Sequence, residues 1–389
     1  MSEWTSVRLA EVAAVTVGHV GPMIDEYRDS GIPFLRSLNV RPHAIEMEDL
    51  RYIDEAFHGT LRKSALAPGD VVTVRTGKPG QTAMIPLSLP VANCSDLIIT
   101  RPGPGLHGRW LSYYLNWVTA THIDSHLVGA VQQHFNIGSA RSLVLDLPPL
   151  DEQRAIAEVL GALDDKIAAN ARLAEVADEL VRARFKSLGD LSDELTTIGT
   201  IAIHPRDLID PTTVSPDVPY VGLEHVPRRH MWMTAKGTAG EISSTKALFR
   251  AGDVLFGKLR PYFHKVVVAS EPGMASTDIL VVRATEPGLR GFLLAAASSD
   301  LTVERCTAAS EGTRMPRTKW KDLAAVQIPW PGEESAREFG AYVDAMSARV
   351  ASAVLESARL AETRDALLPG LMSRNIHVKD TERVIEEVV

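Results

Sequence analysis

An internal repeat is the feature that most constrains the fold of this chain. Four segments recur in the same order, between 181 and 186 residues further along. The pairs are IPFLRSLNV (32–40) with VPYVGLEHV (218–226), GDVV (69–72) with GDVL (252–255), CSDLIITRP (94–102) with STDILVVRA (276–284), and LDLPPLDEQRAIA (145–157) with VQIPWPGEESARE (326–338). The 389 residues therefore contain two copies of one unit of about 180 residues.

Each copy has the same internal order. Short apolar runs bounded by turn residues predict strands, a Pro-rich stop follows, and a long helical pattern ends the copy. We therefore predict an α/β (α+β) fold with two pseudo-repeated domains of short-strand sheets, joined by two long helices. The predicted boundaries are 1–150 for the first domain, 151–188 for the first helix, 189–331 for the second domain, 332–372 for the second helix and 373–389 for a C-terminal tail.

The segment GDVLFGK (252–258) matches the start of a phosphate-binding P-loop, G-x-x-x-x-G-K. A P-loop continues with Ser or Thr, which reaches Mg²⁺, but Leu259 follows here, and VLF (254–256) is typical of a buried strand. The first copy, GDVVTVRTGKPG (69–80), keeps the turn and the strand without the P-loop spacing. We therefore predict a turn and a strand in both copies.

Apolar residues in the two long helical patterns step by three and four, which is the spacing of a coiled-coil seam. A helix of about 34 residues is roughly 50 Å long, which exceeds a domain of this size, so we predict that the two helices pair. A pseudo-twofold relation between the copies would make that pair antiparallel. Asn170 falls near the seam and either fixes the register or is exposed, and Pro369-Gly370 should stop or kink the second helix. The predicted seam is Ile156, Leu160, Leu163, Ile167, Leu173, Val176, Leu180, Phe339, Val343, Met346, Val350, Leu360 and Leu367.

The segment LPPLDEQRAIAEVLGALDDKI (147–167), between a strand-rich domain and a long helix, resembles the specificity (S, HsdS) subunit of Type I restriction-modification enzymes. The resemblance extends to VGAVQQHFNIGSARSLVLDLP (128–148), GDVLFGKLRPYFHKV (252–266) and SEGTRMPRTKWKDLAAVQIPWP (310–331), and it covers nearly the whole chain. The second copy departs from the pattern, because PGEES (331–335) stands where the family has PPLDEQ.

This resemblance implies a non-catalytic reader of double-stranded DNA. Each copy would be a target recognition domain for one half of a split, asymmetric site, and the helices, as an antiparallel coiled coil, would set the gap between the halves. The helices would also dock methyltransferase subunits, two of them, and restriction subunits could join. S-adenosylmethionine, and ATP with Mg²⁺, would then belong to the partner subunits, with no cofactor in this chain. A rod of fixed length that holds two readers makes the half-site spacing a geometric quantity.

The residues themselves also argue against catalysis. An amino-methyltransferase needs an Asp/Asn-Pro-Pro-aromatic loop, which neither DPT (210–212) nor LPPL (147–150) supplies, and no H-E-x-x-H or G-x-S-x-G motif occurs. Cys94 and Cys306 are too few for a disulfide framework or a cysteine zinc site. No apolar run approaches the ~18 residues of a membrane span, and no secretory signal is visible at the start. We therefore predict a cytoplasmic protein that does not contact a membrane.

Candidate DNA contacts are loops dense in the side chains that read base edges, which are Arg and Lys for guanine, Asn and Gln for adenine, and Asp and Glu for cytosine. Since the net charge is −8, such contacts must be local. Basic members should hold phosphates, which positions the protein without specifying sequence. Trp320 and Trp330 are expected in the core. The candidates are Ser37, Asn39, Arg75, Thr76, Lys78, Gln132, Gln133, His134 and Asn136 in the first copy, and Glu224, His225, Arg228, Arg229, Lys258, Arg260, His264, Lys265, Arg314, Arg317 and Lys319 in the second.

Two other classes of function stay open on the sequence alone. A coiled-coil scaffold that only binds proteins would show no salt-dependent and sequence-dependent DNA binding once its partners are present. An enzyme in its own right would bind S-adenosylmethionine or a nucleotide as the isolated chain.

Overall fold

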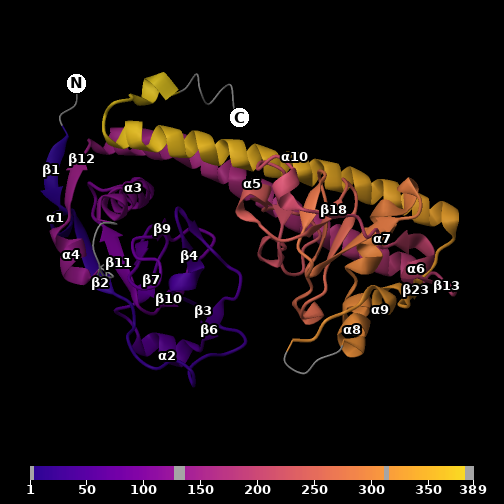
Figure 1. Ribbon diagram of the computed structural model, residues 1–389. Coiled ribbons are helices and arrows are strands. Elements are labelled where there is room, and N and C mark those ends of the chain that lie inside the picture. Colours follow the sequence, from indigo (N-terminus) through magenta and orange to yellow (C-terminus); the bar gives the residue numbers. More distant parts are fainter. Residues whose placement is uncertain (1–3, 127–135, 311–314, 382–389) are drawn as a thin grey trace. The chain divides into compact units, whose positions relative to one another are not determined.

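The computed structural model describes residues 4–126, 136–310 and 315–381 (Figure 1). The chain forms two compact units: unit 1 is residues 1–166 with 359–389, and unit 2 is residues 167–358. Both long helices, α5 (Leu150–Asp190) and α10 (Glu333–Met372), contribute residues to each unit. The first predicted domain therefore lies in unit 1 and the second in unit 2.

Unit 1 is built on two four-stranded sheets. One has the order β2-β11-β8-β9 and is antiparallel, and the other has the order β6-β3-β10-β7, in which β3 and β10 run parallel. Strand β1 pairs with β12, and β4 with β5. The strands are β1 Thr5–Arg8, β2 Ala13–Val17, β3 Ile32–Leu35, β4 Val40–Arg41, β5 Ala44–Ile45, β6 Arg51–Ile53, β7 Ala65–Leu66, β8 Val71–Val74, β9 Thr82–Met84, β10 Ala92–Cys94, β11 Leu97–Pro102 and β12 Val144–Leu147; the helices are α1 Leu9–Val12, η1 Ser37–Asn39 (3₁₀), α2 Glu55–Thr60, α3 Gly108–His126 and α4 Ile137–Ser142.

Unit 2 repeats this topology. Its sheets have the orders β14-β22-β19-β20 and β15-β18-β21-β16-β17, and β13 pairs with β23. The strands are β13 Leu195–Thr197, β14 Ala202–Ile203, β15 Leu208–Ile209, β16 Pro219–Val221, β17 Gly237–Thr238, β18 Lys246–Phe249, β19 Val254–Gly257, β20 Val266–Val268, β21 Gly273–Ala275, β22 Ile279–Ala284 and β23 Gln327–Pro329; the helices are α6 Ile198–Ile201, α7 Arg290–Ala297, α8 Asp300–Ala309, α9 Trp320–Ala324 and the 3₁₀ turns η2 Pro211–Thr213, η3 Leu223–His225, η4 Ala239–Glu241, η5 Pro261–Phe263 and η6 Pro287–Leu289. The predicted internal repeat is thus confirmed in both larger sheets and in the β1-β12 and β13-β23 pairs, with β15 added at one edge and, among the described strands, no counterpart of β4-β5 in unit 2.

The two units differ in the helices that follow strand β11 in unit 1 and strand β22 in unit 2. Unit 1 has the single helix α3, whereas unit 2 has α7 and α8. The break between α7 and α8 falls at Ser298 and Ser299, and the Ser299 hydroxyl accepts a hydrogen bond from the Thr302 N–H, as an N-cap residue does.

The GDV segments form a turn and a buried strand in both units, as predicted. Gly69 and Gly252 have φ of 89° and 85°, a conformation that glycine adopts readily, and β8 and β19 are buried along their whole length. Asp70 and Asp253 close these turns by accepting the backbone N–H of the residue three positions earlier.

Helices α5 and α10 pack against each other as an antiparallel pair, which confirms that part of the prediction (Figure 1). In unit 2, Asn170 donates to the Ala353 carbonyl and the Phe185 ring lies 5.9 Å from that of Phe339, so positions ascend along one helix and descend along the other. In unit 1, the Arg364 guanidinium on α10 binds the Asp164 carboxylate on α5 at 2.6 Å. Asn170 is buried, which favours the first of its two predicted roles.

The predicted seam needs one correction, at Leu180. Leu180 is 49% exposed, and Ala177 and Val181 are buried instead. A helix has 3.6 residues per turn, so a stripe that repeats every 3.5 residues drifts around it, and here the buried face has moved by one position. Ile156, Leu160, Leu163, Phe339, Val343, Val350, Leu360 and Leu367 are buried, and Ile167, Leu173, Val176 and Met346 are half-buried.

Pro369 does not stop the second helix, which was one of the two predicted outcomes, and the helix reaches the predicted boundary at residue 372. Helix α10 continues to Met372. A proline removes its own N–H bond and its ring crowds the carbonyl four residues earlier, but the turn after it can still form, and here the Ser373 N–H reaches the Pro369 carbonyl. No helix in the described part of the chain is both long and apolar enough to cross a membrane.

Candidate nucleic-acid interface

Three separate candidate segments of the second copy meet in unit 2. Leu259 and Arg317 form an antiparallel bridge, in which the Arg260 N–H donates to the Pro316 carbonyl (2.8 Å). The guanidinium carbon of Arg228 lies 4.2 Å from the centre of the Phe263 ring. The structure therefore joins loops around residues 228, 260 and 317 into one surface.

Basic side chains dominate this surface. Arg228, Arg317 and Lys319 are exposed, and Lys258 and Arg260 are half-buried. Arg317 approaches the Asp278 carboxylate at 3.3 Å but keeps 48% of its side chain exposed. Cations in such a position can neutralise phosphates, which is the main source of affinity for DNA. We call these five residues the unit 2 basic surface.

Two of the predicted DNA contacts are buried and serve the fold. Asn39 is fully buried; its carboxamide accepts the Arg36 N–H and donates to two backbone carbonyls of residues 46 and 48. His264 is 4% exposed, and its Nε2–H donates to the Ser298 carbonyl at 2.8 Å. Burial lowers the pKa of His264, so the ring is neutral. Neither side chain can reach DNA, and we correct both predictions.

Two further candidates have structural partners. His225 is equivalent to Asn39, and its Nδ1 accepts the Gly222 N–H (3.0 Å) just as the Asn39 carboxamide accepts a backbone N–H in the first copy. The ammonium of Lys265 donates to the Leu223 carbonyl, and burial together with Arg228 lowers the pKa of Lys265. Glu224 lies exposed next to these residues.

In unit 1 an aspartate organises the candidates at the end of β8. Asp96 binds the Arg75 guanidinium at 2.6 Å and accepts the Thr76 hydroxyl at 2.9 Å, while Lys78 is exposed and Ser37 is half-buried. Asp278, the equivalent of Asp96, holds Arg317 in unit 2. The same position thus orients an arginine in each copy, but the arginine comes from a different segment.

The remaining first-copy candidates lie within or next to residues 127–135. The Asn136 side chain accepts the Ser139 N–H at 2.9 Å and so caps α4. Gln132, Gln133 and His134, together with Arg314 of the second copy, lie outside the described residues.

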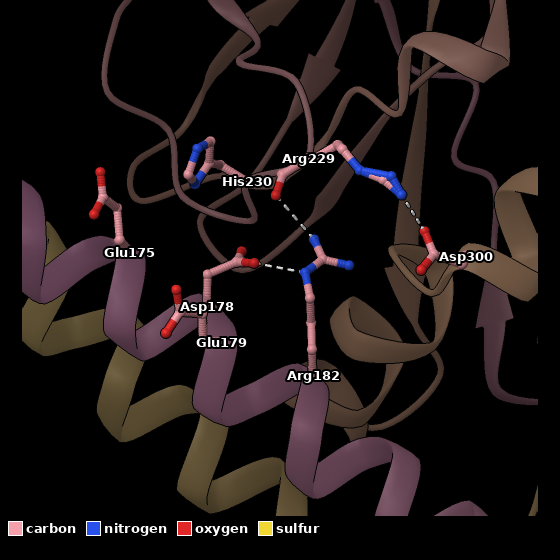
Figure 2. A pocket seen from close by; sticks show the side chains of 7 residues that line it. All are labelled: Glu175, Asp178, Glu179, Arg182, Arg229, His230 and Asp300. Atoms are coloured by element: carbon pink, nitrogen blue, oxygen red, sulfur yellow. Dashed lines mark hydrogen bonds and ion pairs between the residues drawn. The ribbon is translucent and has the colours of Figure 1, made fainter. Parts of the chain in front are cut away.

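Arg229 belongs to a different site, a pocket of about 380 Å³ on the helix side of unit 2 (Figure 2). Arg182 on α5 binds the buried Asp178 carboxylate and donates to the Arg229 carbonyl at 3.2 Å, and the Arg229 guanidinium pairs with Asp300 at 2.7 Å. Asp178 also accepts the Met231 N–H at 2.7 Å. This network fastens α5 to the second domain through the Arg229 backbone, while the Arg229 side chain keeps 61% exposure and stays a candidate DNA contact.

A glycine motif typical of dinucleotide-binding loops lies between β11 and α3. Residues 103–108 read GPGLHG, which matches G-x-G-x-x-G between β11 and α3. The buried Gln153 side chain fills this loop, where it accepts the His107 N–H (2.8 Å) and donates to the Gly105 carbonyl (3.0 Å). β11 also runs antiparallel to both neighbours, unlike the parallel strands of a dinucleotide fold. The loop therefore holds the start of α5 in place. Gln153 is the glutamine of the LPPLDEQ segment, and these hydrogen bonds give that residue its structural role.

The two tryptophans near the end of the second copy and the two cysteines have defined places in the structure. Trp320 and Trp330 pack against the hydrophobic core of unit 2, as expected. Within the described part of the chain, no three His, Cys, Asp or Glu side chains gather as a metal site requires, and Cys94 and Cys306 are buried free thiols.

Comparison with known proteins identifies the first half of this architecture. Residues 1–177 match the family model of the Type I restriction modification DNA specificity domain. Residues 1–177 are thus similar to a Type I DNA specificity domain. The resemblance that the sequence motifs indicated is thereby confirmed.

Individual relatives of this specificity domain agree. The specificity subunit of the Type I restriction enzyme EcoDI from Escherichia coli is 28% identical over 90 residues, which are 23% of this chain and only 20% of that protein. The crystal structure of the Type I restriction-modification S subunit from M. genitalium matches with a TM-score of 0.57 and 14% identity, over 95% of this chain and 96% of that one. The HsdS subunit from Thermoanaerobacter tengcongensis aligns over 95% of this chain and 96% of that one, with 18% identity and a TM-score of 0.34. The M. genitalium match shows that the two chains share one fold over nearly their whole length.

Proposed function

We propose that this chain is the DNA-specificity subunit of a Type I restriction-modification system and reads a bipartite, asymmetric DNA site. One observation carries the proposal: the strand order of the specificity domain recurs in unit 2, while the polar residues on the equivalent loops differ. Two readers with unlike surfaces in one chain match a target with two unlike halves. Arg75 and Thr76 of unit 1, for example, are replaced by Lys258 and Leu259 in unit 2.

The chain would bind and position, and its partners would catalyse. We propose that two methyltransferase subunits dock on α5 and α10 and bring S-adenosylmethionine, and that restriction subunits can join with ATP and Mg²⁺. The unit 2 basic surface, with Arg75 and Lys78 of unit 1, would contact DNA phosphates and base edges. The net charge of −8 fits a subunit whose DNA binding is shared with such partners.

Methylation mapping tests this proposal. The chain is co-expressed with its cognate methyltransferase subunit in a host without other DNA methylation, and modified adenines are located across the genome. We expect one motif of two short defined halves around a fixed gap. Exchanging residues 132–136 should change one half, and Arg317→Ala should relax the other. A soluble complex that methylates at no motif would overturn the proposal in favour of a protein scaffold.

A further inference from the structure

The most unusual backbone in unit 2 lies in the turn of residues 260–264. Pro261–Phe263 form the 3₁₀ turn η5, and the residues on either side, Arg260 and His264, have φ of 50° and 52°. This left-handed conformation is unfavourable for residues other than glycine, by about 1 kcal/mol each or more, and persists only where the surroundings impose it.

The first copy shows that the fold itself does not require this strain. Aligning GDVV (69–72) with GDVL (252–255) places Gly77 opposite Arg260, and Gly77 also has a positive φ, of 87°. Glycine meets the same backbone demand there without cost from a side chain. Unit 2 instead has an arginine at this position, so the side chain itself is the feature that needs an explanation.

The base of the turn is held rigidly. His264 is buried and donates to the Ser298 carbonyl, Pro261 is buried, and the Arg260 N–H is bonded to the Pro316 carbonyl. Such anchoring on both sides fixes the direction of whatever the turn presents. A preorganised contact loses less conformational entropy on binding than a mobile one.

The tip of the turn presents one exposed aromatic ring, packed against a second ring that two cations contact. Tyr262 is 51% exposed, and its ring centre lies 4.9 Å from that of Phe263. Phe263 in turn carries the guanidinium groups of Arg228 and Arg260, at 4.2 Å and 5.9 Å from its centre. Within the described residues, the buried Nε of Arg260 has no hydrogen-bond partner. The Phe263 ring therefore orients two guanidinium groups beside an exposed tyrosine.

We infer that this turn is a specificity-determining contact with the DNA half-site that unit 2 reads. The Tyr262 ring packs against apolar base-edge groups such as the thymine methyl, and Arg228 and Arg260 bind the flanking phosphates. The inference rests on the proposed function, because it names residues of that same DNA site. It also distinguishes the two halves, since the aligned first-copy segment GKPG (77–80) has no aromatic residue.

Binding measurements on the complex with the methyltransferase subunits test the role of Tyr262. Affinity is compared for the mapped target and for a duplex with the unit 2 half-site scrambled. We expect Tyr262→Ala to reduce the ratio of the two affinities about tenfold, the lower end of what one base contact supplies. Tyr262→Phe should retain the ratio, because the ring makes the contact. Leu208→Ala, at a residue of the same unit that is 63% exposed, is the matched control and should change nothing.

A salt titration tests the two arginines separately. Arg260→Asn removes the guanidinium while keeping a residue that tolerates the left-handed conformation, so the turn is preserved. We expect Arg260→Asn and Arg228→Gln each to weaken binding to both duplexes equally and to lower the slope of log affinity against log salt by about 1. Tyr262→Ala should leave that slope unchanged.

The outcomes separate the inference from the proposed function. A wild-type complex that does not distinguish the two duplexes overturns both. A wild-type preference that survives Tyr262→Ala overturns only the inference. Uniform weakening by Tyr262→Ala on both duplexes also overturns it, because the ring would then touch the DNA backbone without reading sequence. If the salt slope is unchanged in both arginine variants, the proposed phosphate contacts of Arg228 and Arg260 are wrong.

Discussion

At the scale of single residues, Asp70 and Asp253 occupy equivalent turns in different electrostatic surroundings. The Arg283 guanidinium donates two hydrogen bonds to the Asp253 carboxylate, at 2.8 and 2.6 Å. In the first copy, the Arg101 Nε lies 3.7 Å from the Asp70 carboxylate. Removing one partner of a buried pair leaves an uncompensated charge, so Asp253→Asn should cost roughly 2–3 kcal/mol of stability. Amide hydrogen exchange in β19 measures this, because a chain of two units need not unfold in one step.

The matched variant Asp70→Asn should behave differently. Burial raises the pKa of Asp70, with the Ala67 N–H and Arg101 offsetting only part of the effect. The folded chain then holds this proton more tightly than the unfolded chain does. Ionisation of Asp70 therefore lowers the free energy of unfolding as the pH rises above the ordinary carboxyl pKa. At neutral pH we expect Asp70→Asn to preserve or increase protection in β8. Equal losses of protection in the two variants would contradict this reading.

Residue type alone could not separate DNA contacts from structural polar groups. Asn39, His225 and His264 were all chosen as candidate DNA contacts by residue type, yet the side chain of each hydrogen-bonds to a backbone group of the protein. That outcome depends on burial, which tertiary packing decides. The sequence also named Lys258 and Arg317 as separate candidates, and their meeting at the Leu259–Arg317 bridge joins two segments that no local pattern connects.

At the scale of elements, helix α10 packs against α7 through glycines. A Cβ on Gly340 would lie 2.3 Å from the Gly288 carbonyl oxygen, and backbone cannot rotate away as a side chain can. Alanine favours a helix over glycine by about 1 kcal/mol, so without this contact Gly340→Ala would stabilise α10. We expect the clash to prevail and to cost a net ~1–3 kcal/mol, seen as a lower thermal midpoint of the chain.

The control for that substitution is Ser352→Ala on an exposed face of the same helix. It should leave the midpoint nearly unchanged. A Gly340→Ala chain that melts at or above the wild type would show that α7 moves aside, and the packing argument would fail.

The repeat made the order of the elements predictable, because a strand pattern seen twice at one spacing is better determined than a pattern seen once. The coiled-coil seam was predicted less well at Leu180, where the buried face passes to Val181. Periodicity gives the face of a helix locally but not its cumulative drift over forty residues. The polar network of Asp178 and Arg182 was missed altogether, since it joins segments that no local pattern connects.

At the scale of the whole molecule, the proposed bipartite reader makes the DNA gap depend on helix length. Inserting seven residues into α5 after Lys166 and seven into α10 after Ala358 preserves the heptad phase of both helices. Each insertion adds about 10.5 Å of helix, which corresponds to roughly 3 base pairs of DNA. We expect methylation mapping to give the original two halves separated by a gap about 3 base pairs longer.

The paired design of this experiment supplies its own control. An insertion in α5 alone shifts one part of its seam against α10, so the Asn170–Ala353 and Asp164–Arg364 contacts cannot both form in one register, and methylation at the motif should be lost. Loss in the single insertion with recovery in the double one would show that the two helices act as a pair. If the doubly extended chain kept the original gap, helix length would not set the separation of the half-sites. The docked partners or the DNA itself would then fix that separation.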